Sequence, residues 1–331
     1  MITFSSHVLD RPDATIRYWI SRPDERSTAP TVVLLHGATL DHHAWDPQIT
    51  ALQNRFTLVV PDLRAHGEST GTFGFTAAVA DVQALLDRLP TERVVLVGLS
   101  LGGNIAQEIV RLDPDRVHAL VVADATCNTA ARYPLEVATG VAALRLQAML
   151  AGPDFARQAA AATAIDPQVQ RYALEANRSR SSQVTLAILT SLLTSLRPDP
   201  VYRLPVPTLL LHGQADPMGD IAGGTAAWAR REPLAEYAVI PDAGHASNLD
   251  NPEVFTEKLE GFLLRVLPEV ATGGLTGGDG PDGTEAQAER LYARYGAHPW
   301  QLVPESTREH FRGLIAAGID GAGHPLLQDA C

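Results

Sequence analysis

The sequence predicts an α/β fold with a mostly parallel, eight-stranded sheet that carries helices on both faces. Short apolar runs rich in valine, leucine and isoleucine alternate along the chain with segments in which apolar residues recur every three or four positions. This alternation is typical of parallel strands joined by right-handed crossovers. With 331 residues, 45% of them hydrophobic, the chain is long enough to bury the core of such a sheet.

The first expected elements lie before residue 90. Residues 2–9 and 14–20 predict an antiparallel pair of strands at the start of the sheet. The expected elements that follow are strands at 31–35 and 57–60 and helices near 43–53 and 75–89. Apolar residues in the helix at 75–89 fall on one face, as expected for a helix packed against a sheet.

The stretch 94–104 predicts a buried strand, a very tight turn and a helix, with Ser100 in the turn. The turn forces Ser100 into a strained backbone conformation. Gly98 and Gly102 fit there because a Cβ at either position would collide with the neighbouring strand or helix. The serine hydroxyl therefore stands exposed at the carboxyl end of the sheet, above a helix N-terminus that favours developing negative charge. This arrangement predicts a nucleophile for acyl transfer.

Two later strands end in loops with the other residue types that a nucleophilic serine requires. The apolar run at 208–211 continues into a polar loop that ends at Asp216, and the strand at 236–240 is followed by His245. The chain order is serine, then acid, then histidine, each just after a strand. On these residues the chain resembles the α/β-hydrolase superfamily over roughly residues 1–267. The resemblance implies that Ser100 is the nucleophile, that His245 acts as general base and then acid, and that Asp216 orients the imidazole.

The apolar run at 32–35 ends in His36 and Gly37, a dipeptide that resembles the first active-site loop of the same superfamily. The resemblance implies an oxyanion hole made by the backbone N–H groups of Ala38 and Leu101. Losing one such donor typically raises a reaction barrier by about 3 kcal/mol.

Asp124 is an alternative candidate for the acid. It follows the apolar strand at 119–123, where some members of this fold place the acid. The His-Gly-x-x-Asp sequence that ends at Asp216 fits the commoner arrangement. We therefore expect Asp216 to orient His245 and keep Asp124 as the alternative.

The alternation of strands and helices is interrupted between residues 125 and 204. Alanine-rich helical patterns near 135–150, 166–178 and 181–195 predict a helical cap inserted into the α/β-hydrolase core. The core then comprises residues 1–124 and 205–270. Leu144, Leu146, Met149, Leu150 and Phe155 predict a mostly apolar substrate cavity beneath the cap.

The end of the chain departs from the rest. A last core helix begins at Pro252, a glycine-rich linker covers 271–284, and a small helical tail covers 285–331. Two helices are expected in the tail, at 285–295 and 306–317. A segment this short rarely supports its own core, so we expect it to pack on the body or to join copies of the chain into a homo-oligomer.

Composition excludes several classes of partner. The net charge of −12 disfavours nucleic-acid binding, and no apolar segment approaches the ~20 residues that span a bilayer. The first 21 residues lack a basic start followed by an apolar run, so a cytoplasmic location is expected. Cys127 and Cys331 suggest neither a disulfide framework nor a metal site, and no metal or cofactor is expected.

The residues around the predicted site narrow the reaction to a small-molecule esterase or lactonase. Dehalogenases and epoxide hydrolases carry an aspartate where this chain has Ser100. After His36 and Gly37, neither the glycines of a lipase-like loop nor the Ser-Gly-rich loop of C–C bond hydrolases follows. The pattern, including the segment 41–48, is most similar to 3-oxoadipate enol-lactone hydrolases. That similarity implies hydrolysis of a carboxylic ester or lactone of a small, largely apolar substrate through an acyl-enzyme.

Three alternatives stay open from the sequence. They are a C–C bond hydrolase, a cofactor-free perhydrolase or haloperoxidase, and a receptor-like protein that keeps the three residues but turns over poorly. Ala38 and Leu101 depart from the haloperoxidase pattern, which has an aromatic residue and a methionine at these positions.

Overall fold

The computed structural model describes residues 3–23, 29–131, 134–178 and 180–267, and the short stretches 308–309 and 312–313. Within these ranges one eight-stranded sheet has the order β1-β2-β4-β3-β5-β6-β7-β8. The strands are β1 Thr3–Arg11, β2 Ala14–Arg22, β3 Thr31–Leu35, β4 Thr57–Pro61, β5 Val94–Leu99, β6 Val117–Ala123, β7 Thr208–Gly213 and β8 Ala235–Ile240. Pairing is antiparallel between β1 and β2 and between β2 and β4, and parallel elsewhere in the sheet. The predicted sheet is confirmed.

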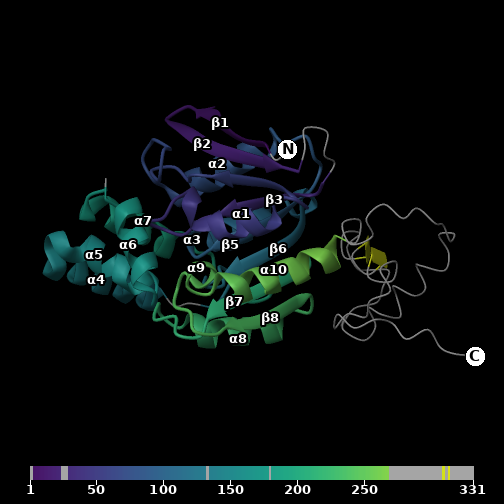
Figure 1. Cartoon of the computed structure of the whole chain (residues 1–331). Coiled ribbons are helices and arrows are strands. Elements are labelled where there is room, and N and C mark those ends of the chain that lie inside the picture. Colours follow the sequence, from purple (N-terminus) through teal and green to yellow (C-terminus); the bar gives the residue numbers. More distant parts are fainter. Residues whose placement is uncertain are drawn as a thin grey trace, which may run out of the picture.

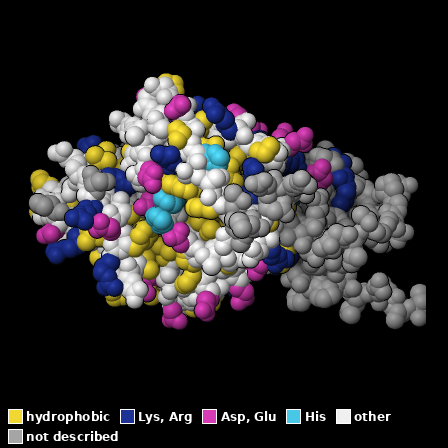
Figure 2. All heavy atoms as spheres, turned by 45° about the horizontal axis from the view of Figure 1, so that its top comes forward, with side chains coloured by type: hydrophobic (Ala, Val, Ile, Leu, Met, Phe, Trp, Pro, Cys, Tyr) yellow, Lys and Arg dark blue, Asp and Glu magenta, His cyan; other side chains and the backbone are white. Residues whose placement is uncertain are grey.

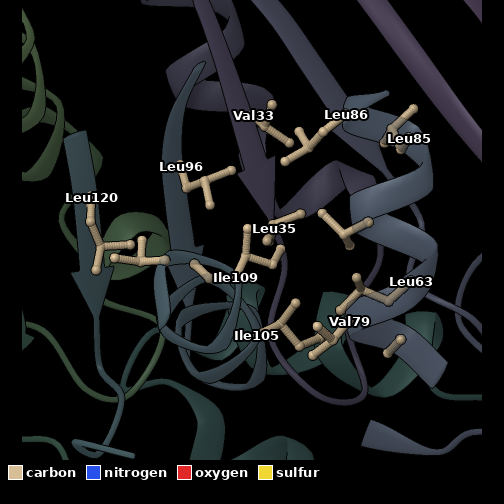
Figure 3. Packing of buried hydrophobic residues seen from close by; sticks show 14 of the residues in the cluster. Val33, Leu35, Leu63, Val79, Leu85, Leu86, Leu96, Ile105, Ile109 and Leu120 are labelled. Carbon is tan, nitrogen blue, oxygen red and sulfur yellow. The ribbon is translucent and has the colours of Figure 1, made fainter. Parts of the chain in front are cut away.

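Helices cover both faces of this sheet (Figure 1). They are α1 Asp46–Leu52, α2 Phe75–Leu86, α3 Leu101–Leu112, α8 Ile221–Arg231 and α10 Pro252–Val266. Side chains alternate between the faces along each strand, so Val33 and Leu35 pack with α2, α3 and α8, whereas Val32 and Leu34 pack with α1 and α10. Figure 3 shows the first of these layers, with Leu35 close to the side chains of α2 and α3.

Four helices between β6 and β7 form a separate group at one end of the strands (Figure 1). They are α4 Pro134–Ala151, α5 Phe155–Thr163, α6 Pro167–Ala176 and α7 Ser182–Ser195. Three helices were not predicted from the sequence: α5, α8 and the short α9 Ser247–Asp250. Helix α5 is short and alanine-rich, α8 contains two consecutive glycines, which lower helix propensity, and α9 has only four residues.

Two further findings bear on the sequence-based expectations. In the part of the chain that the structure describes, none of the helices is both long and apolar enough to cross a membrane. The predicted linker lies outside the described residues, and so do both predicted tail helices apart from 308–309 and 312–313. From that short part, the Glu309 carboxylate accepts a hydrogen bond of 2.6 Å from Arg93 of the body.

Candidate active site

Ser100 lies in the turn between β5 and α3 in a backbone conformation that side chains rarely adopt, with φ 50° and ψ −116°. Glycines make this turn possible. A Cβ on Gly98 would overlap the backbone of Gly102, and a Cβ on Gly102 would overlap the carbonyl of Leu35 at the end of β3. The close approach of β3, β5 and α3 therefore requires both glycines and holds the serine at the end of its strand.

Three loops bring a serine, a histidine and an aspartate together at the carboxyl edge of the sheet. His245, after β8, has its Nε2 2.8 Å from the Oγ of Ser100, after β5. Its Nδ1 lies 2.9 and 3.1 Å from the two carboxylate oxygens of Asp216, after β7. Because a carboxylate only accepts, Nδ1 carries the proton, and Nε2 is left to accept the serine hydroxyl. Asp216 is itself held by the backbone N–H of Met218, at 2.8 Å.

The environment of His245 raises the pKa of its imidazole above the ordinary value. Burial opposes the charged form and lowers the pKa. The hydrogen bond that His245 donates to Asp216 and the negative charges of Asp216 and Asp124 outweigh that penalty. The imidazole therefore takes up a proton from Ser100 at a lower cost in free energy than an ordinary histidine would.

Two backbone N–H groups flank the serine. A Cβ built on Gly37 would lie 3.4 Å from the Cβ of Ser100, which places the loop after β3 directly beside the turn. Leu101 is the first residue of α3, so its N–H has no partner within the helix. Among the described residues, no acceptor takes a hydrogen bond from the N–H of Ala38 or of Leu101. Neither N–H group is thus taken up by a described acceptor, as the predicted oxyanion hole requires.

A family model described as "Alpha/beta hydrolase family" matches residues 32–258, more than half of the chain. The chain belongs to this family. The match spans β3, the Ser100 turn and the loops of Asp216 and His245. The resemblance and the fold class predicted from the sequence are therefore confirmed.

Relatives of this hydrolase include esterases and lactonases. It is 25% identical over 279 residues to 3-oxoadipate enol-lactonase 1 of Acinetobacter baylyi, covering 78% of this chain and 97% of the relative. It is 30% identical over 256 residues to the pimeloyl-acyl-carrier-protein methyl ester esterase of Klebsiella pneumoniae, covering 71% and 94%. A solved thermophilic esterase from Thermogutta terrifontis aligns with a TM-score of 0.64 and 27% identity over 80% of this chain and 99% of that chain. The predicted enzyme class, an esterase or lactonase, is confirmed.

Asp124, the alternative acid, is fully buried in the hydrolase and makes no hydrogen bond to His245. One of its oxygens accepts the N–H of Gly213 at 2.7 Å, and the other accepts the hydroxyl of Ser247 at 2.5 Å. Burial raises the pKa of Asp124 to about 7. The structure thus places Asp216 against the imidazole and uses Asp124 to join the ends of β6 and β7 to the segment after His245.

The cap does not match the apolar cavity predicted from its side chains. Phe155 is buried, but Leu146, Met149 and Leu150 are 51%, 72% and 77% exposed. Figure 2 shows hydrophobic side chains between charged ones across the surface of the cap. The prediction is wrong for these three residues. Because α4 is apolar on all sides, its sequence does not indicate which of its side chains face solvent.

Two residues near the site were not identified from the sequence. The Tyr172 hydroxyl of α6 donates to the Asp41 carboxylate at 2.7 Å, which joins the cap to the loop after β3. Asp250 accepts backbone hydrogen bonds from both the cap and the His245 loop. Asp250 stands directly before the Asn-Pro pair that starts helix α10. Its position in the sequence therefore suggests a residue at a helix end and gives no sign of a contact with the cap. No group of three or more potential metal ligands occurs within the described ranges.

Proposed function

We propose that this hydrolase cleaves a carboxylic ester or lactone of a small, largely apolar substrate through an acyl-enzyme on Ser100. The observation that carries the proposal is the 2.8 Å contact between His245 Nε2 and the Oγ of Ser100 in a strained turn. A base in hydrogen-bonding contact with a hydroxyl, itself oriented by Asp216, is the arrangement that activates a serine.

In this mechanism Ser100 Oγ attacks the ester carbonyl carbon while its proton passes to His245 Nε2. The carbonyl oxygen becomes an oxyanion that accepts the N–H groups of Ala38 and Leu101. His245 then donates its proton to the leaving alkoxide, and the C–O bond breaks to give the acyl-enzyme and an alcohol. In a lactone the alcohol stays attached to the acyl group. His245 next deprotonates a water that attacks the acyl group, and the serine hydroxyl is restored with release of the acid.

The relatives support oxygen esters as the substrate class. Two of them are named as an enol-lactonase and a methyl ester esterase, which both cleave a carboxylic C–O bond. Departure of an alcohol requires a proton donor beside the nucleophile, and His245 occupies that position. The cytoplasmic location and the association of copies through residues 285–331 stay predictions.

The test combines active-site labelling with turnover. A fluorophosphonate probe should label the wild-type chain, and a series of short-chain p-nitrophenyl esters and lactones should give steady turnover. Ser100→Ala should abolish labelling and lower kcat by about 10⁵-fold or more, with an unchanged circular dichroism spectrum. Ser6→Ala, in the exposed part of the edge strand β1, is the matched control and should behave as wild type. Near-normal turnover in Ser100→Ala would exclude the proposal, and labelling without turnover would favour a receptor-like protein.

A further inference from the structure

One carboxylate joins the cap to the loop that holds the histidine. Asp250 Oδ2 accepts the N–H of Gly244 at 2.7 Å and that of Ile165 at 3.0 Å. Its Oδ1 accepts the N–H of Asp166 at 3.0 Å. Gly244 directly precedes His245, whereas Ile165 and Asp166 lie in the cap between α5 and α6. A single side chain therefore satisfies backbone donors from two segments that are far apart in the sequence.

A second hydrogen bond connects the same two segments on the other side of His245. The N–H of Ala246 donates to the carbonyl of Thr163 at 2.7 Å. Both chain neighbours of His245 are thus held to the cap residues 163–166, one directly and one through Asp250. The segments are also in close contact, because a Cβ on Gly244 would lie 3.2 Å from the Asp250 carboxylate and 3.3 Å from Ile165.

The Asp250 side chain is anchored to the core. Asp250 ends the short helix α9, Ser247–Asp250, which directly follows the His245 loop. Ser247 is bound by the buried carboxylate of Asp124. Asn248 donates to the carbonyl of Ala44 at 2.6 Å and to the amide oxygen of Gln48 at 3.2 Å. With α9 fixed in this way, the Asp250 carboxylate stays in place, and the cap segment is held against it.

We propose that Asp250 is a positioning residue that couples the cap to the general base, so that His245 is aligned with Ser100 and Asp216 when cap residues 163–166 are seated. This inference rests on the proposed function. Misplacing a catalytic group by about 1 Å can cost roughly a hundredfold in rate. The contacts of Asp250 therefore set the rate of the chemical step more than the affinity for substrate.

The decisive variant is Asp250→Asn. An amide keeps one acceptor oxygen and replaces the other with an NH₂ group, so either Gly244 or Asp166 of the cap loses its partner. We expect kcat to fall about tenfold or more while KM changes less than about twofold. Glu253→Gln removes the same charge from an exposed side chain three residues away and should leave both constants unchanged. Asp250→Glu keeps both acceptor oxygens and should restore part of kcat.

A pH profile separates positioning from general destabilisation. The carboxylates of Asp216 and Asp124 and the hydroxyl of Ser100 face the imidazole, and Asp216 contributes most to keeping its pKa raised. An imidazole that drifts from Asp216 loses this effect, so the acid limb of kcat/KM should move to lower pH in Asp250→Asn. The positioning role would be overturned if the acid limb of kcat/KM did not move and the fall in kcat only matched a loss of folded protein.

A second variant acts from the cap side. Ile165→Pro removes one backbone donor and leaves the carboxylate intact, and the preceding Ala164 is already extended, at φ −148° and ψ 162°, as a residue before proline prefers. We expect a fall in kcat with a small change in KM, and an unchanged kcat would overturn the proposal even if the Asp250 variants do not fold.

A wild-type chain that is neither labelled nor active would overturn both proposals, whereas a wild-type kcat in folded Asp250→Asn would overturn only the role of Asp250.

Discussion

The sheet and the cap of this hydrolase use apolar residues in different ways. All six residues of β5 are buried or nearly so, and they pack against helices on both faces. In α4 of the cap, Leu146, Met149 and Leu150 are more than half exposed. The hydrophobic effect therefore fixes the position of the sheet. The cap contributes Ile188 of α7 to the same core, and the polar contacts of Tyr172 and Asp250 join it to the loops around the site.

If the core carries the chemistry, its polar residues should give the largest effects on rate. Asp216→Asn should favour the wrong imidazole tautomer and lower kcat by about 10⁴-fold, as the same change does in a well-characterised serine protease. Asp124→Asn should be far milder, because Asp124 makes no hydrogen bond to His245, and the amide can accept from the Gly213 N–H while its NH₂ group donates to the Ser247 hydroxyl. Steady-state kinetics on the two variants measures the difference. A reversed order of severity would make Asp124 the orienting acid.

The same contrast explains what the sequence could predict. Ser100, Asp216 and His245 each follow an apolar run, and parallel strands carry such loops to one edge of a sheet. Both the fold and these positions could therefore be predicted from local patterns. The partners of Asp250 could not be predicted in this way. Ile165 lies 85 residues away from it and donates through its backbone N–H, so the contact does not depend on which side chain stands at position 165. The exposure of Leu146, Met149 and Leu150 could not be predicted either, since α4 is apolar on all sides.

Matched truncations of a leucine in each region test the difference in burial directly. Leu96→Ala in β5 removes a fully buried side chain and should lower the free energy of unfolding by about 2–5 kcal/mol. Leu150→Ala in α4 removes a side chain that is 77% exposed and should change it by less than about 0.5 kcal/mol. Urea denaturation followed by circular dichroism measures both. A large loss in Leu150→Ala would show that the exposed face of the cap is covered in solution.

The buried carboxyl of Asp124 should make stability depend on pH. Its pKa is about 7 in the folded protein and near 3.8 in an unfolded chain, so between these values the folded state binds the extra proton. The protonated group therefore contributes to the free energy of unfolding at low pH. This contribution falls by up to roughly 3 kcal/mol as the pH rises from about 4 to 7. Asp124→Asn cannot titrate and should gain stability relative to wild type over this window. A difference between the two chains that does not vary with pH would contradict the raised pKa.

The smallest effect is expected from the end of the chain, where the proposal is packing or association without a role in chemistry. Ser100, Asp216 and His245 all precede the linker, and in the described part of the tail Glu309 forms an ion pair with Arg93 of the body. An exposed pair of this kind contributes less than about 1 kcal/mol. A chain that ends at Glu269 should therefore keep its esterase activity and phosphonate labelling, while size-exclusion chromatography reports any change in oligomeric state. Arg93→Ala in the full chain is the matched control for loss of the pair alone. Folded, truncated protein without turnover would show instead that the tail shapes the site.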